Sequence, residues 1–141
     1  MDTLNFDFYI YKLIMFISRI CRNFSTWHHT TILALKHKNE TVIIGDGQVT
    51  QGNIRVKTDG KKIRELSPNI YCGFAGSLAD ALSLMDGLET VMNKYPKQTL
   101  RSCIKYAMEW RTGKRLRHLE ATLIVIDKDL IVELDGTGNV L

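Results

Sequence analysis

Alternating apolar and polar positions dominate the chain from Thr31 onward and predict a series of short β-strands. Thr31–Lys36 and Thr41–Ile44 are expected to pair across the polar turn Lys38-Asn39-Glu40. Further strands are predicted at Arg55–Thr58, Lys62–Leu66, Ile70–Phe74, Ala121–Asp127 and Leu130–Leu134. The turn signals between them are Asp59-Gly60, which predicts a two-residue hairpin, Ser67-Pro68-Asn69 and Lys128-Asp129.

Between these strand groups, two segments have helical spacing. In the first, Leu78, Leu82, Met85, Leu88 and Met92 predict an apolar face, Ser77 with Asp80 resembles a capping box, and Pro96 ends the helix. A second helix is predicted from about Gln98 to Thr112, with Leu100, Ile104, Ala107 and Met108 on its apolar side and Gly113 as its stop. Strands, two helices and strands again indicate an α+β domain, with helices packed against antiparallel sheet.

The first residues of the chain differ from this pattern. The apolar run Phe8–Ile17 is interrupted by Lys12 and is shorter than the roughly 20 residues that span a bilayer. In a helix, the basic side chains would gather on one side and the apolar ones on another, as in an organellar targeting peptide, although Asp2 and Asp7 are unusual there. We therefore expect residues 1–29 to be a removable targeting segment or propeptide, with an additional packing helix as the alternative, and residues 30–141 to form the folded domain.

Composition narrows the function classes. The chain has 141 residues, enough for one domain, and a formal net charge of +4, which permits an acidic partner or a nucleic acid but requires neither. Its three cysteines lie far apart, so we expect no disulfide framework and favour a reducing compartment. The four histidines lack the paired spacing of a zinc site, and no metal site is predicted.

Eight short motifs follow one another along the chain: Thr30-Thr31-Ile32, Gly45-Asp46-Gly47-Gln48, Gly52-Asn53, Lys61-Lys62, Gly73-Phe74-Ala75-Gly76, Ala79-Asp80-Ala81, Trp110-Arg111-Thr112 and Leu119-Glu120-Ala121. Their order and near-spacing resemble those of the HslV family of threonine peptidases. From Thr30 to Leu141 the chain therefore resembles this family of N-terminal-nucleophile hydrolases. The resemblance implies antiparallel β-sheets sandwiched between helices. Because the family continues with further strands and a second helix pair, we expect the fold to be incomplete at the C-terminal side.

The resemblance also implies a set of site residues. Thr30 is the nucleophile, Lys62 a cation beside it, Asp46 the anchor of that cation, and Gly76 the residue whose backbone N–H faces the oxyanion. Two further positions belong to the substrate pocket. Val49 supplies an apolar wall, and Gly60 lies near a position that a small apolar residue usually fills.

The chemistry of an N-terminal threonine supports this assignment. A threonine hydroxyl is a weak nucleophile until a base removes its proton. A free α-amino group, with a pKa of about 7.7–8.0, is a suitable base near neutral pH. One residue at a processed N-terminus carries both groups, so the bond between His29 and Thr30 must be cut before the base exists.

Each of these residues also has a structural interpretation. Thr30 could open a strand, Asp46 could cap its own turn, Lys61 and Lys62 could be a solvated strand end, and Gly76 could let the chain turn into the helix. Cys72 suggests a thiol nucleophile, but it lies inside an apolar strand and is expected in the core. The complete set of motifs favours the catalytic interpretation over these alternatives.

The sequence thus predicts an ATP-dependent threonine-type endopeptidase subunit that degrades unfolded proteins inside a ring chamber. Expected partners are further copies of the chain, with the basic run Arg111–His118 as one polar patch, and an HslU-type AAA+ unfoldase that uses ATP. The subunit itself is expected to need no cofactor, and neither membrane nor nucleic acid is an expected partner. The N-terminal segment favours a mitochondrial location, with the cytoplasm as the alternative.

Two other functions are kept open. One is a noncatalytic ring subunit that retains the fold without turnover. The other is a basic nucleic-acid-binding protein, suggested by Trp110, Arg111, Lys114, Arg115, Arg117 and His118. Glu109 and Glu120 flank that run, and basic residues at a helix end also complement the helix dipole.

Overall fold

The computed structural model describes residues 9–15, 31–51, 54–57, 60–113 and 119–141, with backbone alone for 9–15, 49–51 and 54–57. The elements are β1 (Tyr9–Met15), β2 (Thr31–His37), β3 (Glu40–Gly45), β4 (Val49–Gln51), β5 (Ile54–Lys57), β6 (Ile63–Ser67), β7 (Ile70–Gly76), α1 (Leu78–Lys94), α2 (Thr99–Thr112), β8 (Ala121–Ile126) and β9 (Ile131–Leu134).

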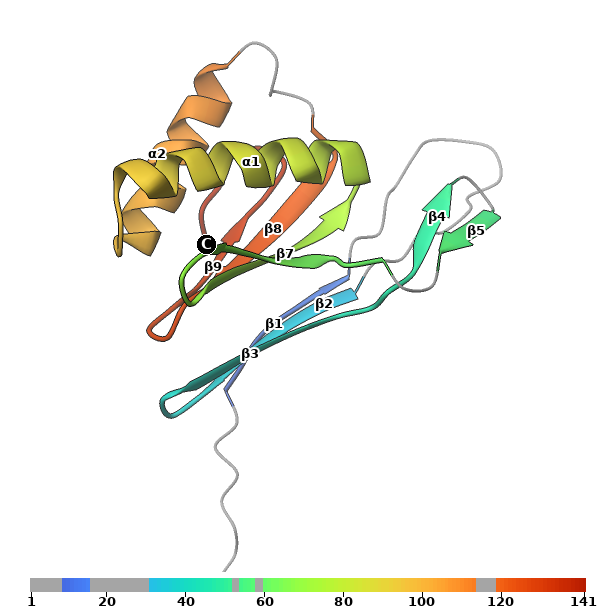
Figure 1. The fold of residues 1–141 in the computed structure, drawn as a ribbon, viewed down its shortest axis with the longest axis horizontal. Coiled ribbons are helices and arrows are strands. Elements are labelled where there is room, and N and C mark those ends of the chain that lie inside the picture. The colour runs from blue at the N-terminus through green and yellow to red at the C-terminus, as the bar shows by residue number, and fades with distance from the viewer. Residues whose placement is uncertain (1–8, 16–30, 52–53, 58–59, 114–118) are drawn as a thin grey trace, which may run out of the picture.

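The strands form three antiparallel sheets, named A, B and C. Sheet A has the order β1-β2-β3, sheet B pairs β4 with β5, and sheet C has the order β6-β7-β8-β9. Figure 1 shows α1 and α2 over one face of sheet C and sheet A along its opposite face. This confirms the predicted α+β class. A helix layer on the outer side of sheet A is not among the described residues.

Strand β8 is the centre of the core because both of its faces are buried. Leu123 and Val125 join the cluster under the helices, whereas Ile124 and Ile126 pack against Ile32 and Ala34 of sheet A. The contact between the two sheets requires a glycine in β7. A Cβ on Gly73 would lie 2.9 Å from Ile32 Cγ2, so any side chain there would push the sheets apart.

Three of the predicted hairpins are confirmed. His37 pairs with Glu40 across Lys38-Asn39, and Ile126 pairs with Ile131 across the turn at Lys128-Asp129. Between β6 and β7, Pro68 is followed by Asn69 with φ of 63°, the arrangement that a turn of type II requires. Asn69 is a residue type that tolerates a positive φ, so the local sequence specifies this turn, whereas Lys38, with φ of 53°, enters the same region less readily.

The hairpin predicted at Asp59-Gly60 is wrong. β5 pairs backward with β4, a strand that the pattern did not predict, while β6 pairs forward with β7. Gly60 instead donates its N–H to the Gly47 carbonyl at 2.8 Å. The chain between β5 and β6 therefore passes from one sheet to another, and the partner of each strand is set by contacts outside the local sequence.

The helical interpretation of the N-terminal segment is also wrong where the structure describes it. Tyr9–Met15 is a strand that runs antiparallel to β2, with Met15 opposite Thr31. Its tyrosines and isoleucines favour extended backbone, and the edge of β2 offers unpaired backbone groups. Removal of residues 1–29 stays a prediction. No helix in the described part of the chain is long and apolar enough to cross a membrane.

Both helices form close to the predicted positions, but the faces that they bury match the predicted ones only in part. In α1, the predicted Met85, Leu88 and Met92 are buried together with Ala81, Leu84 and Val91, whereas the predicted Leu78 and Leu82 are exposed. In α2, the predicted Ala107 is buried beside Cys103, Tyr106 and Trp110, whereas Leu100, Ile104 and Met108 are exposed. Contacts with the other helix and with the sheet decide which apolar side chains are covered.

We expect Leu84→Ala to lower the free energy of unfolding by about 2–5 kcal/mol, because Leu84 is fully buried in the main core. Leu82→Ala is the matched control, since the same truncation at a position that is 43% exposed should cost less than about 1 kcal/mol. Urea unfolding of both variants measures the difference. Equal losses would mean that Leu82 is buried as deeply as Leu84.

Candidate active site

An ion pair joins the end of β3 to the start of β6. Asp46 follows β3 directly and Lys62 directly precedes β6. Lys62 Nζ donates to Asp46 Oδ1, and the lysine side chain is only 5% exposed. A buried ammonium needs a partner of opposite charge, so this contact is a condition for placing Lys62 inside the fold. The solvated strand end proposed as an alternative for Lys62 is thereby excluded.

The second oxygen of the same carboxylate holds the backbone of Thr31. Asp46 Oδ2 accepts the Thr31 N–H at 2.7 Å, and Asp46 N–H donates to the Thr31 carbonyl at 3.1 Å. The Thr31 amide belongs to the peptide bond between Thr30 and Thr31. Thr30 itself lies outside the described residues, but the amide of the peptide bond that follows it is bound by Asp46.

The environment of Asp46 favours its charged form. Burial raises the pKa of this carboxyl, but the hydrogen bond from Lys62 and those from the amides of Thr31 and Gln48 outweigh it, so the pKa lies below its ordinary value of 3.8. Because the folded pKa is depressed, ionised Asp46 stabilises the fold at pH values above 3.8. That contribution is lost as the pH falls through the folded value.

Gly76 ends β7 two residues after the point where this strand contacts the Lys62 backbone. Phe74 donates its N–H to the Lys62 carbonyl at 3.1 Å, and Ser77 donates its own to the Glu120 carbonyl at 2.7 Å on the other side. Successive amides along a strand point in opposite directions, so the Gly76 N–H faces the same side as that of Phe74. Beyond Phe74, the Gly76 N–H is the next amide on that side of the strand.

The predicted pocket residues lie around the same turn. The bond between Gly60 and Gly47 places Gly60 beside the Asp46 loop. Val49 belongs to β4, and its side chain lies outside the described residues. Cys72 is fully buried in β7, where burial raises the pKa of its thiol, so this thiol is a core group.

The sequence pattern did not identify Gln48 as part of the site. Its backbone N–H donates to Asp46 Oδ1 at 3.0 Å, two residues from the carboxylate that accepts it. This is an Asx turn, and the signal for it was present in the sequence as an aspartate between two glycines. The turn function and the ion-pair function of Asp46 therefore coexist on one oxygen, because Oδ1 accepts from both Gln48 N–H and Lys62 Nζ while Oδ2 accepts the Thr31 N–H.

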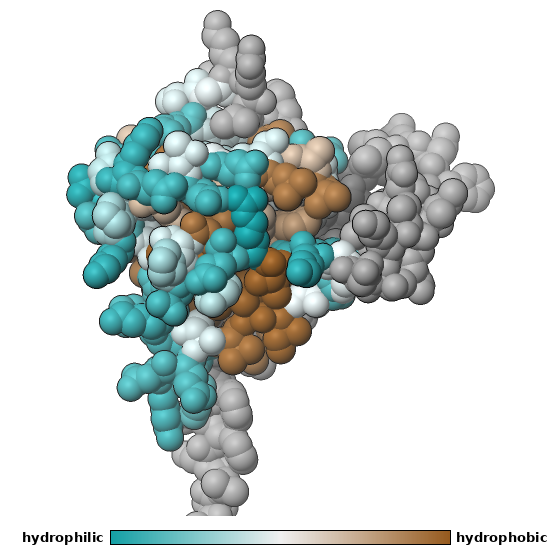
Figure 2. All heavy atoms as spheres, viewed as in Figure 1, coloured by the Kyte–Doolittle hydropathy of each residue, from teal (hydrophilic) through white to brown (hydrophobic). Residues whose placement is uncertain are grey.

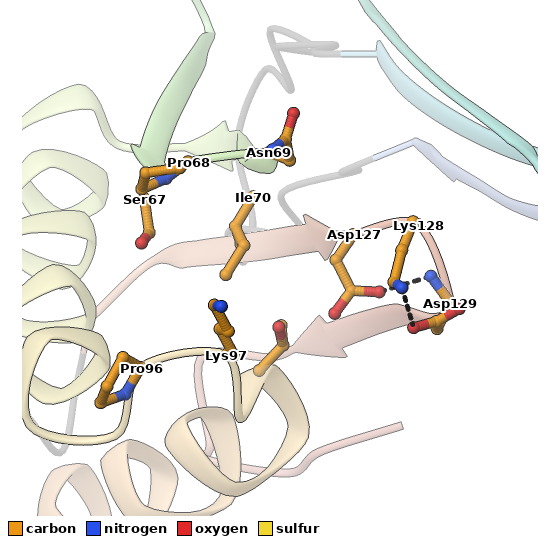
Figure 3. Close-up of a pocket in the computed structure, with 10 residues that line it drawn as sticks. Ser67, Pro68, Asn69, Ile70, Pro96, Lys97, Asp127, Lys128 and Asp129 are labelled. Atoms are coloured by element: carbon orange, nitrogen blue, oxygen red, sulfur yellow. Dashed lines mark hydrogen bonds and ion pairs between the residues drawn. The ribbon is translucent and has the colours of Figure 1, made fainter.

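A cavity of about 640 Å³ lies at a different place, between the β6–β7 turn, the α1–α2 loop and the β8–β9 turn (Figure 3). Lys97 and Lys128 line it together with Asp127 and Asp129, so the opposite charges of its lining balance. It contains none of the predicted catalytic residues. Among the described residues, no three His, Cys, Asp or Glu side chains are grouped as metal ligands.

Residues 27–140 match the family described as proteasome subunit. The chain belongs to the proteasome subunit family. Its relatives include ATP-dependent protease subunit HslV of Caulobacter sp. (strain K31), which is 46% identical over 120 residues, covering 84% of this chain and 64% of that protein. HslV of Wolbachia sp. subsp. Brugia malayi (strain TRS) is 44% identical over 113 residues, covering 79% of this chain and 64% of that protein.

A solved structure agrees with these relatives. Eukaryotic HslV from Trypanosoma brucei superposes with a TM-score of 0.73 at 43% sequence identity, covering 78% of this chain and 64% of that one. The chain thus spans about 64% of the length of the relatives that it matches. The resemblance to HslV and the N-terminal-nucleophile fold are confirmed. The roles of individual residues stay predictions.

We expect Lys62→Met to raise the pKa of Asp46, because burial of the carboxyl then acts without the cation that opposes it. Lys61→Met is the matched control, since Lys61 is the exposed neighbour in the sequence and should leave that pKa unchanged. Carboxyl carbon NMR titration measures both. An unchanged value in Lys62→Met would mean that the two backbone amides alone keep the carboxyl ionised.

Proposed function

We propose that this chain is a threonine-type endopeptidase subunit in which Thr30, once freed at its amino side, is the nucleophile. One observation carries the proposal. The Asp46 carboxylate binds both the buried Lys62 ammonium and the amide that directly follows Thr30. This carboxylate brings a cation and the start of the mature chain to one place, as nucleophilic catalysis by an N-terminal residue requires.

The reaction proceeds in two stages, acylation of Thr30 and hydrolysis of the resulting ester. Thr30 Oγ attacks the carbonyl carbon of the substrate peptide, and the Thr30 amine takes the hydroxyl proton. The tetrahedral oxyanion receives a hydrogen bond from the Gly76 N–H. Collapse breaks the C–N bond, the leaving amine takes the proton, and a threonyl ester remains. Water, deprotonated by the same amine, then hydrolyses that ester and restores Thr30.

Lys62 acts on this reaction through its charge. An ammonium beside the α-amino group favours the neutral form of the amine, which is the form that accepts a proton. It also stabilises negative charge that develops on Oγ and on the substrate oxygen. Asp46 keeps the ammonium in place, because a lysine side chain held by a salt bridge and by burial loses the freedom to turn away.

The complete assembly is part of the same proposal. The named relatives are subunits of ATP-dependent proteases, so we infer a partner ATPase of the HslU type that unfolds protein substrates and consumes the ATP. The peptidase subunit uses no cofactor in this scheme. Rings of subunits enclose the sites, which keeps an unselective nucleophile away from folded proteins.

Exposed apolar side chains support self-association. Figure 2 shows such side chains gathered over β3, where Val42 and Ile44 are exposed, and near the start of α1. On α2, Leu100, Ile104 and Met108 follow one another at every fourth residue, with exposed fractions of 47%, 43% and 56%; we call them the α2 stripe. Apolar contact area supplies more association energy than exposed ion pairs do. Of the basic run, residues 114–118 lie outside the described part.

The nucleic-acid alternative loses one of its supporting residues. Trp110 is 1% exposed and packs beside Tyr106, with the ring centroids 6.2 Å apart, so its ring is not available to stack on a base. The noncatalytic ring subunit remains a distinct alternative, and the experiment below separates it from the proposed enzyme.

In the native processed protein, we expect Thr30→Ala to abolish hydrolysis of a fluorogenic peptide and Lys62→Ala to lower it by about 100-fold or more, as loss of an electrostatic catalyst does. Cys72→Ser should keep most of the activity. Mass spectrometry must find Thr30 as the first residue of the active form. Intact rings without turnover in the wild type would favour the noncatalytic subunit, and full activity in Thr30→Ala would refute the nucleophile.

We expect Ile104→Asp to break rings into smaller species, because it places a charge in the middle of the α2 stripe. Lys105→Asp is the matched control, since it introduces the same side chain at the adjacent exposed position. Sedimentation velocity with and without the ATPase and ATP measures both variants. Rings of unchanged size in Ile104→Asp would place the interface between copies elsewhere on the surface.

A further inference from the structure

Two of the family motifs, Ala79-Asp80-Ala81 and Leu119-Glu120-Ala121, have no role in the scheme above, yet they contact each other. Asp80 lies in the first turn of α1, and Glu120 directly precedes β8. Asp80 Oδ2 accepts the Glu120 N–H at 3.1 Å, across 40 residues of sequence. A long-range bond from a charged side chain to a backbone amide fixes the relative position of two elements.

This contact replaces the capping box that the sequence predicts. Ser77 Oγ does accept from the Asp80 N–H, at 3.5 Å, so half of the box forms. In the other half, Asp80 would accept the Ser77 N–H. That N–H donates instead to the Glu120 carbonyl at 2.7 Å. Asp80 is thereby available to accept the Glu120 N–H, so Glu120 is held at both ends: its N–H by Asp80 and its carbonyl by Ser77.

The Glu120 carbonyl also presses against Gly76. The φ of Gly76 is +109°, and a Cβ there would lie 2.2 Å from the Glu120 oxygen and 2.9 Å from Ala121 Cα. The backbone of Gly76 therefore packs directly on the Glu120–Ala121 peptide group, which adjoins the amide that Asp80 binds. A shift of Glu120 is passed to Gly76, because no side chain separates the two backbones.

We propose that Asp80 is a positioning residue for the oxyanion site: through Glu120 it sets where the Gly76 N–H points. This inference rests on the proposed function, in which that N–H binds the tetrahedral oxyanion. Asp80 does not touch the substrate. Its effect is confined to the transition state, because a displaced donor weakens the bond to the oxyanion more than it weakens the binding of the uncharged substrate.

The test compares Asp80→Ala, Asp80→Asn and Asp86→Asn in the native processed protein. Asp80→Ala should lower kcat about tenfold with KM within about twofold of wild type, since misplacement of a catalytic donor costs rate rather than affinity. Asp80→Asn keeps an acceptor oxygen and should recover most of the rate. Asp86→Asn removes an exposed carboxylate of the same helix, one that pairs with Arg64, and should change neither constant by more than about twofold.

A peptide aldehyde inhibitor separates positioning from loss of folded enzyme. Thr30 Oγ adds to the aldehyde carbon, the hydroxyl proton is retained in the adduct, and the former carbonyl oxygen occupies the oxyanion site. The inhibition constant should rise in Asp80→Ala by the same factor as kcat falls. If kcat falls with an unchanged inhibition constant, Asp80 only maintains the amount of active protein, and the proposal is wrong.

Two further outcomes are distinguishable. If wild type is active, Thr30→Ala is inactive and Asp80→Ala equals wild type, the proposed function stands and the positioning role is refuted. If wild type shows no hydrolysis that Thr30→Ala abolishes, the proposed function fails, and the role of Asp80 in it fails as well.

Discussion

The Asp46 carboxylate is the constraint on which the rest of the site depends. Asp46 follows the last strand of sheet A, and its partner Lys62 precedes the first strand of sheet C. The carboxylate accepts hydrogen bonds from the Lys62 ammonium and from two backbone amides. A lysine that is 5% exposed is tolerated in the fold because this carboxylate compensates its charge. The same contacts that permit burial bring the cation to the peptide that follows Thr30. The hydrogen bonds that stabilise this junction are therefore the same ones that assemble the candidate site.

The layers of the fold give that junction rigid support. β8 is buried on both faces, by the helices on one side and by sheet A on the other, so the central sheet cannot shift without opening two cores. β7 beside it carries both Gly73, which lets the sheets approach, and Gly76, which lets Glu120 approach. Close packing of backbone on backbone leaves little freedom at the end of β7. The Gly76 N–H at that end is consequently held in one direction.

Apolar side chains remain exposed on β3 and α2, away from the Asp46 turn. Such surfaces are unfavourable in water and mark places where a protein meets further structure. The chain spans about 64% of the length of the relatives that it matches.

Local pattern alone predicts most strands from Thr31 onward, the turns at Asn69 and Lys38, the two helices with their ends, and the α+β class, but neither β1 nor β4. These follow from short-range preferences for backbone angles and from periodicity. Its motifs also indicated Asp46, Lys62 and Gly76 as one set. Tertiary contacts select which apolar residues of each helix are covered, pair β5 with β4, hold Tyr9–Met15 as a strand, and bring Asp80 to Glu120. Each of these depends on a partner far away in the chain, whose position local pattern does not encode.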